Sequence, residues 1–140
     1  MNLKFKVLEG GTLPTRAHRE DAGFDLYCPI ELFMLSHGQS RTVPLKVCVE
    51  IPKGYVGFIM GRSSLNKNGV ICMTGVIDSG YTGEIAVTLL NMSQNQNVFF
   101  KGSRIAQLVV AKLADIDDAV AVDSLEDSER GAGGFGSTGA

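Results

Sequence analysis

The chain has 140 residues, enough for one domain with a hydrophobic core and too few for two domains of ordinary size. Hydrophobic residues make up 44% and charged residues 20%, which excludes a disordered chain, and no apolar run approaches the roughly 18–20 residues that span a bilayer. Residues 1–114 hold 12 basic and 8 acidic residues but no Lys/Arg stripe, which suits a small anionic ligand and argues against nucleic-acid and membrane partners.

Short alternating runs predict the first strands. Residues 1–7 alternate polar and apolar side chains, which indicates a strand rather than a signal peptide, so we expect the protein in the cytoplasm, or in the host cytoplasm if the source is viral. Residues 45–51 place aliphatic side chains at the odd positions and end in the turn Pro52-Lys53-Gly54. Residues 55–60 follow as a more fully buried strand.

The centre of the chain predicts a short helix and a hairpin. Residues 63–67 are typical of one helical turn, capped by a serine and stopped by Asn68-Gly69. Residues 70–77 and 84–91 predict two strands joined by the glycine-assisted turn 78–83.

Two more strands and an arm complete the chain. Residues 98–100 and 105–112 predict strands, and so many short strands with little helix favour an all-β antiparallel sandwich or barrel. Residues 115–140 hold one basic and seven acidic residues, and the last eleven include five glycines. We therefore expect a β domain over residues 1–114 and an extended arm over residues 115–140.

The three cysteines, Cys28, Cys48 and Cys72, have no C-x-x-C spacing, and the two histidines complete no zinc pattern. Unpaired core thiols in a reducing compartment are the expectation.

Five stretches are more elaborate than folding requires: residues 21–26, 61–65, 75–83, 102–108 and 130–139. The first offers two carboxylates for a hydrated metal ion, or an ordinary turn with a solvated acid. The second offers a guanidinium and two hydroxyls at a helix start, which is an oxyanion site or a capped turn.

The other three stretches have the same two interpretations. Asp78 with the nearby Tyr81 indicates either a catalytic acid beside a stacking surface or turn chemistry. Gln107 lies inside an apolar strand, as a ligand contact or as a satisfied core amide. The tail combines an arginine, one aromatic residue and a Ser-Thr pair, which a linker seldom needs, and it contains no Walker A loop.

In this order and at these separations, the five stretches resemble the five motifs of trimeric dUTP pyrophosphatases (dUTPases), and the match spans residues 21 to 139. The resemblance implies a distorted jelly-roll β-barrel in a homotrimer, whose C-terminal arm closes over a neighbouring active site. Each site is then a composite of motifs one, two and four from one subunit, the hairpin from a second and the arm from a third. The implied reaction converts dUTP and water to dUMP and pyrophosphate with Mg²⁺, which limits uracil incorporation into DNA and supplies dUMP for thymidylate synthesis.

The resemblance also implies residue roles. Asp78 resembles the general base that activates water for attack on the α-phosphorus. Tyr81 would pack on deoxyribose and reject a 2′-hydroxyl, and Asp25 would hold Mg²⁺ indirectly, through water, with substrate phosphates supplying most ligands. The remaining substrate-binding residues by resemblance fall into three groups: Gly75, Val76, Ile77 and Ala86 for uracil; Arg62, Ser63, Ser64 and Gln107 for phosphates; Arg130, Phe135, Gly136, Ser137 and Thr138 in the arm.

Two departures from the motif and two alternatives remain. The usual second motif is Pro-Arg-Ser-Gly-Leu, but Gly61 and Ser64 stand here for its proline and glycine, so we expect altered geometry rather than lost chemistry. A dCTP deaminase-like enzyme of the same fold would lack the arm and use a glutamate beyond the hairpin. This chain has the arm, and its Glu84 is better explained as a surface residue at the start of a strand. A non-catalytic, dUTPase-like regulatory protein is the other alternative.

Overall fold

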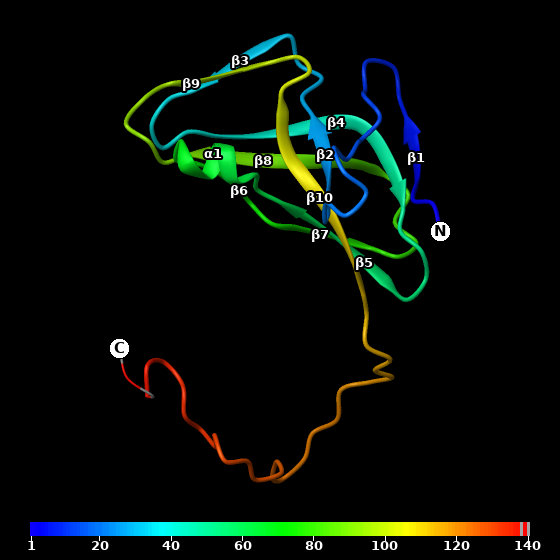
Figure 1. Ribbon diagram of the computed structural model, residues 1–140, viewed down its shortest axis with the longest axis vertical. Coiled ribbons are helices and arrows are strands. Elements are labelled where there is room, and N and C mark those ends of the chain that lie inside the picture. The colour runs from blue at the N-terminus through cyan, green and yellow to red at the C-terminus, as the bar shows by residue number, and fades with distance from the viewer. Residues whose placement is uncertain (138, 140) are drawn as a thin grey trace.

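The computed structural model describes residues 1–137 and 139, which form ten strands and one short helix in this part of the chain (Figure 1). In chain order these elements are β1 (Lys4–Val7), β2 (Gly23–Tyr27), β3 (Leu32–Leu35), β4 (Ser40–Glu50), β5 (Tyr55–Met60), α1 (Ser63–Lys67), β6 (Val70–Cys72), β7 (Gly75–Asp78), β8 (Glu84–Asn91), β9 (Asn97–Phe100) and β10 (Arg104–Lys112). Among the described residues, no helix is long and apolar enough to cross a membrane.

The strands form three antiparallel sheets. One has the order β1-β4-β8-β6, the second β2-β10-β5-β7, and the third pairs β3 with β9. Sequence neighbours are mostly not sheet neighbours, so the chain crosses repeatedly between the two larger sheets, as in a jelly roll. The all-β prediction is therefore confirmed, although the ladders among the described residues do not close into a continuous barrel.

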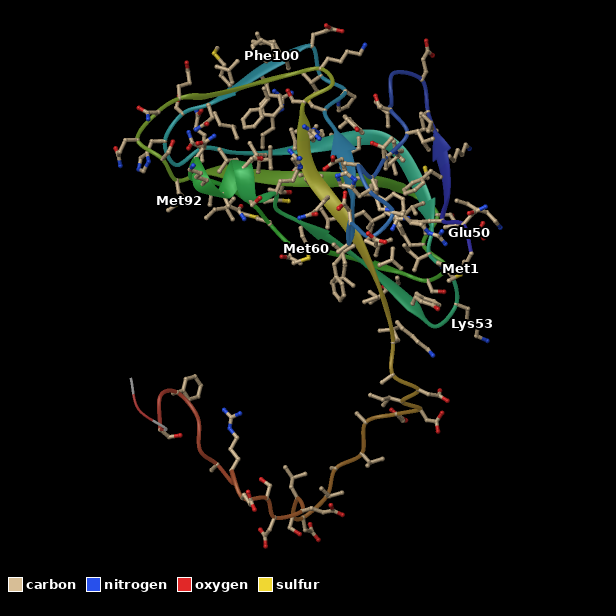
Figure 2. The ribbon with its side chains drawn as sticks, viewed as in Figure 1. Met1, Glu50, Lys53, Met60, Met92 and Phe100 are labelled. Carbon is tan, nitrogen blue, oxygen red and sulfur yellow. The ribbon has the colours of Figure 1, made fainter. Side chains whose placement is uncertain are left out.

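One hydrophobic core lies between the sheets. Every second side chain of β8, and of β4 from Val43 onward, points into this core. The side chains buried along β4 are Val43, Leu45, Val47 and Val49, and those along β8 include Ile85, Val87 and Leu89. Each such side chain contributes roughly 1.5–3 kcal/mol on burial. Figure 2 shows the side chains on the ribbon.

The cysteines are free, as expected, and two of them belong to the core. Burial raises the pKa of the Cys28 thiol, and it raises the pKa of the Cys72 thiol to about 11. These thiols are therefore packing groups rather than nucleophiles.

Three predictions about local structure were wrong. Residues 70–77 are not one strand: the Met73 N–H still donates to Thr88 of β8, and the chain then crosses at Gly75 to pair with β5 in the other sheet. Consequently β7 and β8 lie in different sheets and do not form a paired hairpin. No serine caps α1, because Arg62 occupies the N-cap position without a side-chain cap bond.

Two strands were missed because their sequences do not alternate cleanly. Residues 21–26 were expected to form a loop, but Gly23–Tyr27 is strand β2, paired with β10. Leu32–Leu35 is strand β3, whose Phe33 stacks on Phe99 of β9 at 4.7 Å between ring centroids.

The chain leaves the sheets after β10. The Leu113 N–H donates to the Gly54 carbonyl, and residues 114–137 then contain neither helix nor strand. Figure 1 shows this segment running away from the sheets, and its hydrogen bonds are local. Its apolar side chains are exposed, with Ile116 at 77% and Leu125 at 87%.

Candidate active site

A polar pocket of about 330 Å³ opens at one end of the β2-β10-β5-β7 sheet. The pairing register explains its composition, because Asp25 lies beside Gln107 and Gln107 lies beside Met60 on three successive strands. Arg62 follows two residues after Met60, which is labelled in Figure 2. The lining residues are Ala17, Asp21, Ala22, Gly23, Asp25, Arg62, Ser63, Arg104 and Gln107.

Two arginines bind the central carboxylate of the pocket. Arg62 Nε donates to Asp25 Oδ1 at 2.9 Å, and the Arg104 guanidinium donates to Asp25 Oδ2 at 3.3 Å. The Asp25 side chain is 18% exposed and that of Arg62 is 22% exposed, so this ion pair is largely shielded from water, whereas Arg104 is half-exposed and its ion pair is partly screened by solvent. This group of three residues carries a net positive charge, which suits an anionic ligand.

Gln107 is fixed at the floor of the pocket. Its amide donates to the Gly61 carbonyl at 2.8 Å, which leaves the side-chain oxygen directed at β2. A Cβ at Gly23 would lie 2.2 Å from that oxygen, so only glycine allows the two strands to hold Gln107 in this position.

The start of α1 forms one wall of the pocket. The Leu65 and Asn66 N–H groups both donate to the Arg62 carbonyl, whereas the N–H groups of Ser63 and Ser64 precede the first intrahelical bonds. Ser63 lines the pocket, while Ser64 is exposed outside it.

Gly61 also has a local reason to be glycine. A Cβ there would lie 2.8 Å from the Asn66 side-chain oxygen, so a proline at this position would displace that side chain.

A second pocket, of about 220 Å³, lies between β7 and the start of β8. Because β7 is the edge strand of its sheet and β8 belongs to the other sheet, the backbone groups on the outer edge of β7 are not used by a ladder with β8. We call this pocket the interstrand slot; its lining residues are Ile59, Gly75, Val76, Ile77, Tyr81, Glu84, Ile85 and Ala86.

Tyr81 forms one wall of the slot and is held at both ends. Its N–H donates to the Asp78 carbonyl at 3.2 Å, and its hydroxyl donates to the Glu84 carbonyl at 2.9 Å. The ring lies against Gly83, where an added Cβ would approach the hydroxyl oxygen to 2.5 Å. Gly80, with φ of +95°, supplies the left-handed residue that this turn requires.

Asp78 is exposed at the far end of β7, away from the polar pocket of its own chain. It pairs with Val56, whereas Gln107 pairs with Met60 on the same strand β5. Four residues of strand separate these two rows by about 13 Å. One chain therefore brings Asp25, Arg62 and Gln107 together but leaves Asp78 apart from them.

The arm that contains the predicted residues runs away from the sheets (Figure 1), and none of these residues lines either pocket. Arg130 Nε donates to the Gly133 carbonyl at 2.9 Å, and the Phe135 side chain is fully exposed. Gly136 and Ser137 lie in the same turn, and Thr138 falls outside the described residues.

Residues 9–139 match the dUTPase family model, which covers nearly the whole chain. The chain belongs to the dUTPase family. Among curated relatives, the deoxyuridine 5′-triphosphate nucleotidohydrolase of Saccharomyces cerevisiae is 44% identical, over 91% of this chain and 87% of the relative. That of Clostridioides difficile is 39% identical, over 99% of this chain and 98% of the relative.

Solved dUTPase structures are similar as well. The dUTPase of Staphylococcus bacteriophage 80alpha with dUPNHPP is 29% identical, has a TM-score of 0.86 and matches over 99% of both chains. A dUTPase mutant from phage phi11 of S. aureus, with a structural Mg(II) ion, shares the fold at 24% identity and a TM-score of 0.82, over 91% of this chain and all of that chain.

Two residues of this dUTPase were not predicted as parts of the site. Arg104 shares Asp25 with Arg62; its position three residues before Gln107, in the same motif, was the available signal. Glu84 was expected to be a surface residue at the start of a strand, but its carboxylate accepts a backbone hydrogen bond from Lys46 at 2.7 Å. That contact depends on a bulge in β4 that has no sequence signature.

Proposed function

We propose that this protein is a dUTP diphosphatase that hydrolyses dUTP to dUMP and pyrophosphate, limiting uracil incorporation into DNA and supplying dUMP for thymidylate synthesis. The observation that carries the proposal is the interstrand slot. There the edge strand β7, whose outer backbone groups do not pair with β8, lies near Tyr81, and Asp78 is the last residue of β7. We place the reaction in the cytoplasm, where a reducing environment suits three free cysteines.

The slot suits uracil. Strand-edge N–H and C=O groups at Gly75 and Ile77, with Ala86 on the facing strand, can pair with uracil O4 and N3–H. Cytosine presents the opposite donor and acceptor at both positions, and each buried mismatch costs about 1–3 kcal/mol. Val76 adds an apolar wall, and the narrow space disfavours the methyl group of thymine.

Tyr81 and Asp78 provide the next two functions. The Tyr81 ring is fixed by its two hydrogen bonds, so it forms a flat wall that contacts deoxyribose and excludes a 2′-hydroxyl. Asp78 is exposed at the end of the slot, where its carboxylate can orient and deprotonate a water for in-line attack on the α-phosphorus.

The phosphate-binding residues come from a second chain in this proposal. With uracil at Gly75–Ile77 and the α-phosphorus near Asp78, the triphosphate extends away from Arg62 of the same chain. The polar pocket of a neighbouring subunit then supplies Arg62, Ser63 and Gln107, with Ser64 beside them. A homotrimer with three composite sites satisfies this requirement.

The arm of a third chain completes the site. The apolar and aromatic side chains of its described residues are exposed, and these residues make only local hydrogen bonds, as expected for a segment whose partner surface is another subunit. Phe135 stacks on uracil, Arg130 neutralises phosphate charge, and Gly136, Ser137 and Thr138 close over the γ-phosphate.

The donor set fits a Mg²⁺ that is bound mainly by substrate. The described residues contain no cluster of three or more His, Cys, Asp or Glu side chains that could hold a metal, and both Asp25 oxygens already accept hydrogen bonds from arginines. Asp25 would therefore act through metal-bound water, as Mg²⁺ commonly allows. When bound, Mg²⁺ supplies charge that neutralises the phosphate chain.

A nucleotide-specificity assay tests the function. Purified protein with Mg²⁺ should release pyrophosphate from dUTP far faster than from dCTP, dTTP or UTP. Ammonia released from dCTP, or no turnover of any of the four nucleotides, would contradict the proposal.

A further inference from the structure

Strand β4 contains a bulge opposite the start of β8. Pro44 pairs with Ala86 and Cys48 pairs with Glu84, so β4 contains two more residues than β8 between these two pairs. Lys46, in the bulge, has φ of +58°, a left-handed conformation that non-glycine residues rarely adopt. Such a conformation persists only where the surrounding structure enforces it, and it frequently marks a functional site.

Two neighbours hold the bulge. Glu84 Oε1 accepts the Lys46 N–H at 2.7 Å, whereas the Lys46 ammonium is 3.9 Å from the same oxygen. On the other side, the Lys46 carbonyl accepts the Leu8 N–H at 2.8 Å, and a Cβ at Gly11 would lie 2.2 Å from that carbonyl. The backbone contact, rather than the ion pair, is therefore the short bond made by Glu84.

The same residue also anchors Tyr81. The Glu84 carbonyl accepts a hydrogen bond from the Tyr81 hydroxyl at 2.9 Å. Glu84 therefore binds the β4 bulge through its side chain and the Tyr81 ring through its main chain. Both Tyr81 and Glu84 line the interstrand slot.

We propose that Glu84 is a positioning residue for sugar discrimination. Its carboxylate binds the Lys46 N–H in the β4 bulge and so fixes the start of β8, whose Glu84 carbonyl positions the Tyr81 ring. This inference rests on the proposed function, because it assigns Tyr81 to the deoxyribose. The hydrogen bond from the Lys46 N–H needs an acceptor oxygen at position 84 and not a negative charge. Glutamine at position 84 keeps that acceptor, and methionine removes it at nearly the same length. A glutamate that took part in proton transfer, as in the deaminase alternative, would not tolerate glutamine.

The test compares E84Q and E84M with wild type. The measurements are the ratio of kcat/KM for dUTP over UTP, and the calorimetric ratio of affinities for dUMP over UMP, which requires no turnover. We expect E84M to lower both ratios by about tenfold and E84Q to stay within about twofold. K46G retains the N–H and relieves the left-handed strain, so it should also stay within about twofold.

A second variant keeps the test decisive if E84M unfolds. Y81F removes the hydroxyl but keeps the ring, and it should lower both ratios without touching the bulge. Where E84M folds, Y81F/E84M should lose little more than either single variant, since both act through one contact.

Four results overturn the proposal: unchanged ratios in a folded E84M, unchanged ratios in Y81F, E84Q as impaired as E84M, or a wild type that binds dUMP and UMP equally. A wild type that discriminates between the two monophosphates but does not hydrolyse dUTP would contradict only the proposed function.

Discussion

A mixture of two impaired variants should recover activity if each site is built from different chains. D78N removes the proposed base and R62A removes a phosphate contact. The strand register separates the row of Asp78 by about 13 Å from the row of Gln107, which lines the same pocket as Arg62. Neither change disturbs the core, since Asp78 is exposed and Asp25 retains Arg104 as a partner in R62A. Each homotrimer alone should be strongly impaired.

If the two kinds of subunit assemble at random, the fraction of active sites in the mixture can be calculated. In a 1:1 mixture, a site works when it takes Asp78 from an R62A chain and Arg62 from a D78N chain, which happens in about a quarter of sites. If both residues acted from one chain, no hybrid site would work. The double variant D78N/R62A mixed 1:1 with wild type provides the matched control, with about a quarter of sites active for the composite site and about half for a single-chain site.

Pyrophosphate release from dUTP is the assay, after subunits have been unfolded together and refolded, with size-exclusion chromatography to confirm trimers. Mixed D78N and R62A trimers that show only the sum of their separate activities would refute the composite site. A control mixture that keeps half the wild-type activity would refute it independently.

Two further predictions concern the arm and the core. Truncation before Arg130 should leave the melting temperature and the trimer unchanged while most dUTP turnover is lost, because the described arm residues bond only locally; collapse of the trimer would show a structural role instead. Burial raises the folded-state pKa of Cys72 to about 11 from a usual value of 9.0, so the thiol of the unfolded chain ionises first as the pH rises. Urea unfolding should therefore show wild type losing about 1 kcal/mol more stability than C72A between pH 8 and pH 10. Equal losses in both proteins would contradict that assignment.

The strands that could be predicted were apolar or alternating runs bounded by turn residues. Residues 55–60 and 84–91 were predicted with the bounds found in the structure, because each strand has a clear apolar pattern between turn residues. Strand β2 was not, since Phe24, Asp25 and Leu26 mix a charged residue with apolar ones, and only the arginine partners of Asp25 explain how it is accommodated. Residues 70–77 form an almost unbroken apolar run, which contains no local signal for the crossing between sheets at Gly75.

The candidate site divides in the same way. The motif residues were found through the resemblance of five stretches to the dUTPase motifs, and three of them, Asp25, Arg62 and Gln107, do meet in one pocket. What the sequence could not provide were contacts that depend on register. The Lys46 bulge is one of these, since nothing in Leu45-Lys46-Val47 departs from ordinary alternation, yet Lys46 is left-handed.

The arm after β10 contains no helix or strand over residues 114–137, and this has a consequence for how the enzyme responds to dilution. A flexible segment of the length of residues 113–137 has a root-mean-square span of about 25–30 Å, and such a tether gives its end group a local concentration in the millimolar range. If the arm closes the site as proposed, closure should therefore be independent of the protein concentration as long as the subunits remain associated. A free peptide with the sequence of residues 126–140 would need millimolar concentration to replace the arm of a truncated enzyme.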